Sequence, residues 1–142
     1  MERRQFIKQS CLSCAGIIAG GTLISLMESC VAMPVYNVTE KTNIIEVPKS
    51  KFVESNIVMI KTPWLSNDIL LVKKTETDYN ALYMQCSHED QILTATNNGL
   101  YCSAHGSVFD LDGNVQKEPA LKPLRKFKTT INNETITITL KN

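Results

Sequence analysis

Short runs of apolar and β-branched residues alternate with turn-forming residues along most of the chain. The clearest run lies near the C-terminus, where threonine alternates with isoleucine or leucine over residues 135–140. A period of two with β-branched residues predicts a strand with one buried face. Asn132 and Asn133 precede this run and predict a hairpin turn from a strand over residues 124–131. Four more strands are predicted over residues 43–48, 55–61, 68–73 and 80–85.

The predicted strands together define the fold class. No stretch after the first thirty residues has the spacing of an amphipathic helix. Evenly spaced short strands with turn formers between them predict a small all-β domain over residues 43–142, built as an antiparallel sandwich or barrel. Residues 31–42 are polar and show no clear periodicity, so we expect them to be a tether.

The composition is that of an ordinary folded protein of 142 residues, with 43% hydrophobic and 20% charged residues. These fractions exclude wholesale disorder, and the length favours a single domain. A net charge of +1 and 6% aromatic residues provide neither the basic surface nor the stacking platform of a nucleic-acid binder. The five cysteines are unevenly spaced and do not suggest a disulfide scaffold, so each needs its own explanation.

Residues 1–29 have the layout of an export signal, with a charged head followed by an uncharged stretch of small and apolar residues. The head reads RRQFIK from Arg3 to Lys8 and resembles a twin-arginine signal, in which paired arginines precede a phenylalanine and an aliphatic residue. That resemblance implies export of an already folded protein. The alternative is an ordinary basic head, and the glycine and serine residues of the apolar stretch make a permanent membrane span weak.

The apolar stretch ends in the sequence MESC, which resembles a lipoprotein box. The resemblance implies that Cys30 is lipidated and becomes the new N-terminus, followed by a tether over residues 30–42. The alternatives are cleavage nearby, for instance after Ala32, and an uncleaved signal anchor. Cys11 and Cys14 are spaced as C-x-x-C, but they lie inside the signal, where small-residue filler is the favoured interpretation.

Two separate segments each offer one thiol and one imidazole. The first contains Cys86 and His88, and the second contains Cys102 and His105. Cysteine and histidine are ligands for borderline and soft metals. An Asn-Asn-Gly hairpin signal at residues 97–99 returns the chain between the two pairs, so we expect both pairs to meet at one end of the sheet.

This pattern resembles the Rieske iron–sulfur domain. The likeness continues after the second pair with the sequence HGSVFD, a turn over residues 112–114 and a proline-containing loop over residues 118–124. It covers residues 43–142. It implies an all-β Rieske-type fold with two cluster-binding loops at one end.

The resemblance also implies one [2Fe–2S] cluster, with Cys86 and Cys102 on one iron and His88 and His105 on the other. Two neutral imidazoles in place of two thiolates raise the reduction potential above that of all-cysteine clusters. A structural zinc site is the alternative for the same residues. Zinc fingers usually pair cysteine with cysteine and histidine with histidine, whereas each segment here is mixed.

Further residues matter for the reduction potential in the family. Ser107 matches a serine whose hydroxyl lies near the cluster in high-potential members, so it joins the expected cofactor-binding residues. Phe109 stands where those members have a tyrosine. Their paired cysteines fall near Gln91 and at Ala104 in this sequence, so no disulfide is expected. Because hydrogen bonds to the cluster sulfurs raise the potential, we expect an intermediate-to-low value.

Five basic residues follow the second ligand pair, and they have two interpretations. They can attract an acidic redox partner, or they can form the solvated face of a strand, which is the favoured interpretation. The residues are Lys117, Lys122, Arg125, Lys126 and Lys128.

The leading interpretation is an exported electron-transfer protein at the periplasmic or outer face of the cytoplasmic membrane. It would be a one-electron carrier, or the small subunit of a membrane-associated respiratory or oxidoreductase complex, and it would act with redox partner proteins. The alternative is the ferredoxin component of a ring-hydroxylating oxygenase, which usually carries no export signal. A zinc-stabilised binding module is a third class. No nucleophile triad, phosphate loop or substrate pocket is recognisable, which favours a carrier or subunit over a stand-alone catalyst.

Overall fold

The computed structural model describes residues 32–141 of the chain. These residues form eleven strands and a short 3-10 helix, η1 (Lys49–Phe52). The strands of the larger sheet are β1 (Val35–Asn37), β2 (Ile44–Pro48), β3 (Ile57–Lys61), β4 (Ile69–Thr75), β5 (Asp78–Tyr83), β10 (Lys126–Ile131) and β11 (Thr135–Thr139). The strands of the smaller sheet are β6 (Thr94–Thr96), β7 (Gly99–Tyr101), β8 (Val108–Phe109) and β9 (Val115–Lys117).

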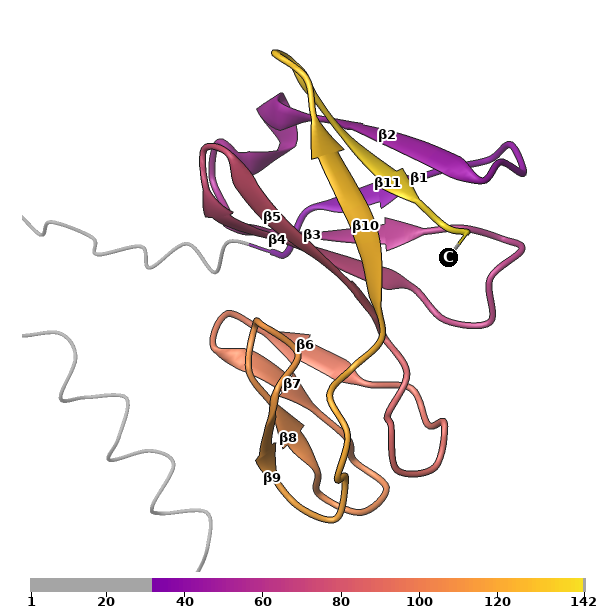
Figure 1. The fold of residues 1–142 in the computed structure, drawn as a ribbon, viewed down its shortest axis with the longest axis vertical. Helices are drawn as coiled ribbons and strands as arrows, with labels where there is room; N and C mark the ends of the chain where they lie inside the picture. Colours follow the sequence, from indigo (N-terminus) through magenta and orange to yellow (C-terminus); the bar gives the residue numbers. More distant parts are fainter. Residues whose placement is uncertain (1–31, 142) are drawn as a thin grey trace, which may run out of the picture. The chain divides into compact units, whose positions relative to one another are not determined.

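The larger sheet has the strand order β1-β3-β4-β5-β10-β11-β2, and the smaller sheet has the order β6-β7-β8-β9 (Figure 1). Every pair is antiparallel except β1 with β3, which is parallel. The smaller sheet is inserted between β5 and β10, which are themselves neighbours in the larger sheet. Both connections to the smaller sheet therefore leave the larger sheet at the same place, as Figure 1 shows.

The predicted all-β fold is confirmed, and all six predicted strands are present. The predictions over residues 43–48, 55–61 and 68–73 correspond to β2, β3 and β4, and those over residues 80–85, 124–131 and 135–140 correspond to β5, β10 and β11. The predicted turn at Asn132 is also present, because its N–H donates to the carbonyl of Thr135 at 2.9 Å. The second predicted hairpin lies between β6 and β7, where Thr96 pairs with Gly99.

The segment expected to be a tether contains a strand, β1. Residues Val35–Asn37 pair in parallel with Met59, Ile60 and Lys61 of β3. Three residues carry too short a period to be recognised in the sequence. The strand forms because it covers the edge of β3, whose N–H and carbonyl groups would otherwise lack partners on that side.

Two groups of buried side chains make up the core. One is formed by side chains of the larger sheet and of η1 and contains Ile45, Val47, Phe52, Val58, Ile60, Ile69, Leu71, Tyr79, Ala81, Tyr83, Phe127, Ile136 and Ile138. The other joins the two sheets and contains Ile57, Leu70, Val72, Leu82, Met84, Cys86, Leu93, Leu100, Cys102, Phe109, Ala120 and Leu124. Both cysteines of the predicted site belong to the second group, so the packing that holds the sheets together also holds these two thiols.

The proposed signal, its two cysteines and the proposed lipid-anchor Cys30 lie outside the described residues. Within residues 32–141, no helix has the length and apolar character required to cross a membrane.

Candidate metal centre

The first predicted ligand pair lies in a closed loop over residues 86–91, which follows β5. The N–H of Cys86 donates to the carbonyl of Gln91 at 2.8 Å, and the N–H of Asp90 donates back to the carbonyl of Cys86 at 3.0 Å. Two backbone bonds therefore fix the cysteine at the base of the loop. His88 lies between them, on the exposed side of the turn.

The second predicted pair lies in a loop over residues 102–107 that repeats this pattern between β7 and β8. The N–H of Cys102 donates to the carbonyl of Ser107 at 2.8 Å, and the N–H of Gly106 donates to the carbonyl of Cys102 at 2.9 Å. Gly106 has φ 83°, and Asp90, at the matching place in the first loop, has φ 56°. Aspartate is one of the few residues besides glycine that adopt this left-handed conformation. The two loops therefore turn alike.

The loops place the two kinds of side chain at different depths. Cys86 and Cys102 are each only 1% exposed, and both are free thiols. His88 and His105 are exposed, and their rings meet edge to face with centroids 5.1 Å apart. All four residues predicted from the sequence are thus brought to one end of the domain, with the thiols inside and the imidazoles outside.

This layering fits a two-metal centre better than a single ion. A tetrahedral zinc with bonds of about 2.0–2.3 Å brings all its ligand atoms to within about 4 Å of one another. Among the described residues, the group whose potential ligand atoms lie within 4.8 Å of one another contains His88, Glu89 and His105, and neither cysteine. Two buried thiols and two exposed imidazoles match a cluster in which the two thiolates bind one iron and the two imidazoles bind the other.

A third segment, residues 118–124, is hydrogen-bonded to both ligand loops. The buried hydroxyl oxygen of Ser107 accepts the N–H of Ala120 at 3.0 Å, and both residues are 0% exposed. The hydroxyl of Ser87 donates to the carbonyl of Lys122 at 2.5 Å. Each ligand loop is therefore fastened to this proline-containing segment by one serine. The Ser107 oxygen acts as the acceptor in its bond, so its own proton remains available for donation.

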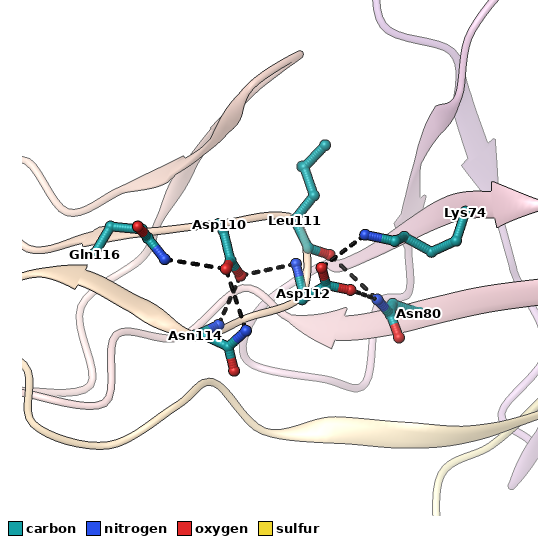
Figure 2. Close-up of polar contacts among 7 residues, drawn as sticks. All are labelled: Lys74, Asn80, Asp110, Leu111, Asp112, Asn114 and Gln116. Carbon is teal, nitrogen blue, oxygen red and sulfur yellow. Dashed lines mark hydrogen bonds and ion pairs between the residues drawn. The ribbon is translucent and has the colours of Figure 1, made fainter.

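The turn between β8 and β9 is built around Asp110 (Figure 2). Its carboxylate accepts the backbone N–H groups of Asp112 and Asn114 at 2.9 and 2.8 Å. It also accepts the side-chain amides of Asn114 and Gln116 at 3.1 Å each. Because β8 directly follows the second ligand loop, this turn fixes the strand that anchors the loop.

Asp112 connects the same turn to the larger sheet (Figure 2). Its carboxylate accepts hydrogen bonds from Lys74 of β4 at 2.7 Å and from Asn80 of β5 at 2.8 Å. The hydrogen bond with Lys74 lowers the pKa of Asp112 below its usual value, and the same bond raises the pKa of Lys74. A polar contact thus supplements the apolar core between the two sheets.

The remaining residues singled out in the sequence have clear places. Phe109 is fully buried in the core group that contains both cysteines. Gln91 and Ala104, where a disulfide was not expected, are exposed. The five basic residues are also exposed, and Lys126 and Lys128 flank the buried Phe127 on β10. That alternation supports the interpretation as a solvated strand face for this part of the group.

Glu89 is not among the site residues predicted from the sequence. Its carboxylate oxygen lies 3.6 Å from Nδ1 of His105, and both side chains are about half exposed. The signal was present in the spacing, because Glu89 stands at the same offset from Cys86 as His105 does from Cys102. Without the hydrogen bonds that align the two loops, this correspondence has no structural meaning.

Residues 43–128 match the family model described as Rieske [2Fe-2S] domain. No curated protein matches the chain by sequence. The chain is similar in structure to the cyanobacterial plasma membrane Rieske protein PetC3 from Synechocystis PCC 6803, with a TM-score of 0.57 and 20% identity over 67% of this chain and 98% of that chain. It is also similar to the ferredoxin of carbazole 1,9a-dioxygenase from Nocardioides aromaticivorans IC177, with a TM-score of 0.50 and 15% identity over 70% of this chain and 100% of that chain. For naphthalene 1,2-dioxygenase the TM-score is 0.56, with 15% identity over 70% of this chain and 26% of that chain.

At these identities the solved structures show the shared fold, and the family model carries the assignment. The match spans more than half of the 142 residues and includes both ligand loops. The chain therefore belongs to the family of Rieske [2Fe–2S] domains, which bind one [2Fe–2S] cluster and transfer electrons.

Proposed function

We propose that this chain is an exported electron-transfer protein in which Cys86 and Cys102 bind one iron and His88 and His105 bind the other. The observation that carries the proposal is the pair of matching loops, which hold two buried thiols beneath two exposed imidazoles. Ser107 completes the cofactor-binding set, because its buried hydroxyl has a proton free to donate. The cluster supplies the storage of one electron.

The different exposures of the ligands give the site its function. Buried thiols keep water away from one side of the site, and the low polarity of their surroundings strengthens every electrostatic effect there. The exposed edges of His88 and His105 lie where a partner protein can approach. Electrons therefore enter and leave on the histidine side, through contact with a redox partner, and no substrate pocket is required.

The proposal includes export by the twin-arginine route and attachment to the membrane through a lipid on Cys30. Its support is the RRQFIK head and the MESC sequence within residues 1–30. Export of a folded protein suits a cluster that is inserted before translocation. The protein would then act on the periplasmic or outer face of the cytoplasmic membrane, as a carrier or as the small subunit of a respiratory or oxidoreductase complex. An uncleaved signal anchor is the other means of attachment.

A second candidate function is the ferredoxin component of a ring-hydroxylating oxygenase. The similarity in fold to the ferredoxin of carbazole 1,9a-dioxygenase favours it, with 70% of this chain aligned to the whole of that chain. Neither Gln91 nor Ala104 supplies the extra cysteines of high-potential Rieske proteins, which suits a ferredoxin as well. The export signal is the feature that separates the two candidates.

Fractionation of the producing cells tests the proposed location. We expect the protein in the membrane fraction on the outer face, labelled by a radioactive fatty acid, and we expect Cys30→Ala to abolish the label. We also expect Arg3→Lys combined with Arg4→Lys to leave the protein in the cytoplasm. Unlabelled protein in the cytoplasm of the unsubstituted strain would favour the ferredoxin instead.

Iron and sulfide analysis of purified variants tests the ligand assignment. Cys86→Ser, His88→Ala, Cys102→Ser and His105→Ala should each lose the cluster, while Ser103→Ala, an exposed change in the same loop, should keep it. Full iron content in any of the four would remove that residue from the site.

A further inference from the structure

The first ligand loop carries a carboxylate where the second carries a histidine. The backbone hydrogen bonds that close the loops align Cys86 with Cys102, and this alignment pairs Glu89 with His105. The two loops turn alike, their histidine rings are in contact, and the matching side chains of Glu89 and His105 lie close together. Glu89 is therefore directed toward the same end of the domain as the proposed iron ligands.

The distances place the Glu89 carboxylate directly against the imidazoles. One of its oxygens is 3.6 Å from Nδ1 of His105, and potential ligand atoms of Glu89, His88 and His105 all lie within 4.8 Å of one another. Among the described residues, no other carboxylate lies within 4.0 Å of a histidine nitrogen. The side chain is 55% exposed, so solvent weakens its field without removing it.

A negative charge beside the two imidazoles changes the reduction potential of the proposed cluster. With two thiolates and two neutral imidazoles as ligands, the cluster has no net charge when oxidised and one negative charge when reduced. The added electron is repelled by a neighbouring carboxylate, so the reduced state becomes less favourable. The consequence is a lower reduction potential.

A second acidic residue in the same loop allows this effect to be separated from a general surface charge. Asp90 follows Glu89 and is exposed, with φ 56°. Among the described residues, the Asp90 carboxylate does not lie within 4.0 Å of a histidine nitrogen, whereas that of Glu89 does. Asp90 therefore serves as the control charge.

We propose that Glu89 sets the reduction potential of the cluster, by holding a negative charge against the imidazoles of His88 and His105. This inference rests on the proposed ligand assignment. It adds a group, absent from the predicted set, that favours the oxidised state of the centre. It also acts in the same direction as the missing hydroxyl at Phe109, so both features favour the intermediate-to-low potential expected from the sequence.

The test is protein-film voltammetry of the cluster-loaded full chain and three variants. Glu89→Gln removes the charge with almost no change in shape, Glu89→Asp keeps the charge, and Asp90→Asn removes the neighbouring charge while keeping a residue that tolerates positive φ. We expect Glu89→Gln to raise the potential, Glu89→Asp to restore most of the original value, and Asp90→Asn to produce a smaller rise. Raising the ionic strength should narrow the difference between the unsubstituted protein and Glu89→Gln, because salt screens an exposed charge.

The reduced EPR spectrum and the iron content accompany each measurement, and they separate the two possible failures. If Glu89→Gln keeps the full cluster signal but the potential does not move, or if Asp90→Asn moves it equally, the inference on Glu89 is wrong and the proposed function stands. If the histidine variants keep the cluster, the ligand assignment itself fails. If Glu89→Gln takes up no cluster, the reduction potentials of the unsubstituted protein and of Glu89→Asp are measured at several ionic strengths instead. Potentials that do not change with ionic strength would overturn the inference.

Discussion

The buried hydroxyl of Ser107 joins the second ligand loop to the proline-containing segment, so Ser107→Ala should affect both stability and redox behaviour. Its oxygen accepts the N–H of Ala120 at 3.0 Å, and both residues are 0% exposed. The substitution leaves a buried N–H without this acceptor, which costs about 1–3 kcal/mol. A loss of about 2 kcal/mol changes the ratio of folded to unfolded protein roughly thirtyfold.

Urea unfolding, monitored simultaneously by circular dichroism and by cluster absorbance, measures this loss. The two signals distinguish unfolding of the chain from release of the cluster. Because release of the cluster can make unfolding irreversible, the midpoints are compared at a fixed protein concentration and without oxygen. Ser103→Ala is the matched control, since Ser103 lies in the same loop and is exposed. An unfolding midpoint for Ser107→Ala equal to that of Ser103→Ala would show that the bond between Ser107 and Ala120 does not stabilise the fold.

The same variant tests the assignment of Ser107 to the cofactor-binding residues. Since its oxygen accepts from Ala120, its own proton can be donated to a cluster sulfur, and such bonds raise the reduction potential. We therefore expect Ser107→Ala to lower the potential, and Ser103→Ala to leave it unchanged. Lower stability with an unchanged potential would show that the hydroxyl only supports the fold.

Three further predictions concern the surroundings of the ligand loops. Phe109→Tyr should raise the reduction potential, because it supplies the hydroxyl that high-potential members have, and an unchanged voltammogram would contradict the alignment. Asp112→Asn should cost less than about 1 kcal/mol at neutral pH, since the bond to Lys74 is partly exposed. This bond lowers the pKa of Asp112 in the folded protein, so its stabilisation is present above the pKa of the unfolded state and is lost as the pH falls through the pKa of the folded state. The urea midpoints of Asp112→Asn and of the unsubstituted protein should therefore converge in acid. A difference that stays constant with pH would contradict this role of the bond. Gly113→Ala should lower the free energy of unfolding by about 1–2 kcal/mol, because alanine adopts φ 76° at that cost. The new Cβ would also lie 3.0 Å from the Leu82 side chain, which must move to make room. An unchanged thermal unfolding temperature would refute this prediction.

The sequence predicted the strands whose patterns are long enough to show a period. β11 is the clearest example, because five alternating residues from Thr135 to Thr139 bury one face, and the turn at Asn132 is determined by local chemistry. By contrast, β1 and the strands of the smaller sheet have only two or three residues each. They form because partner strands and the shared core stabilise them, and such long-range contacts leave no local pattern.

The candidate site also has a part that could be predicted from the sequence and a part that could not. The ligand types and their spacing were readable, because Cys86, His88, Cys102 and His105 form a motif of chemically distinctive residues. The role of Glu89 was not readable, because it depends on the alignment of two loops by backbone hydrogen bonds. The conformation of Asp90 was not predictable either, since only the structure shows that it has a positive φ at the place that Gly106 occupies in the second loop.

The most direct test of the proposed cluster is the reduced EPR spectrum of the purified full chain, combined with iron analysis and with pulsed measurements on protein labelled with nitrogen-15 histidine. We expect two irons per chain, a Rieske-type spectrum and two coupled histidine nitrogens, one from His88 and one from His105, because the sequence contains two histidines. A colourless protein with one zinc, or an iron–sulfur spectrum without coupled histidine nitrogens, would contradict the proposed cluster.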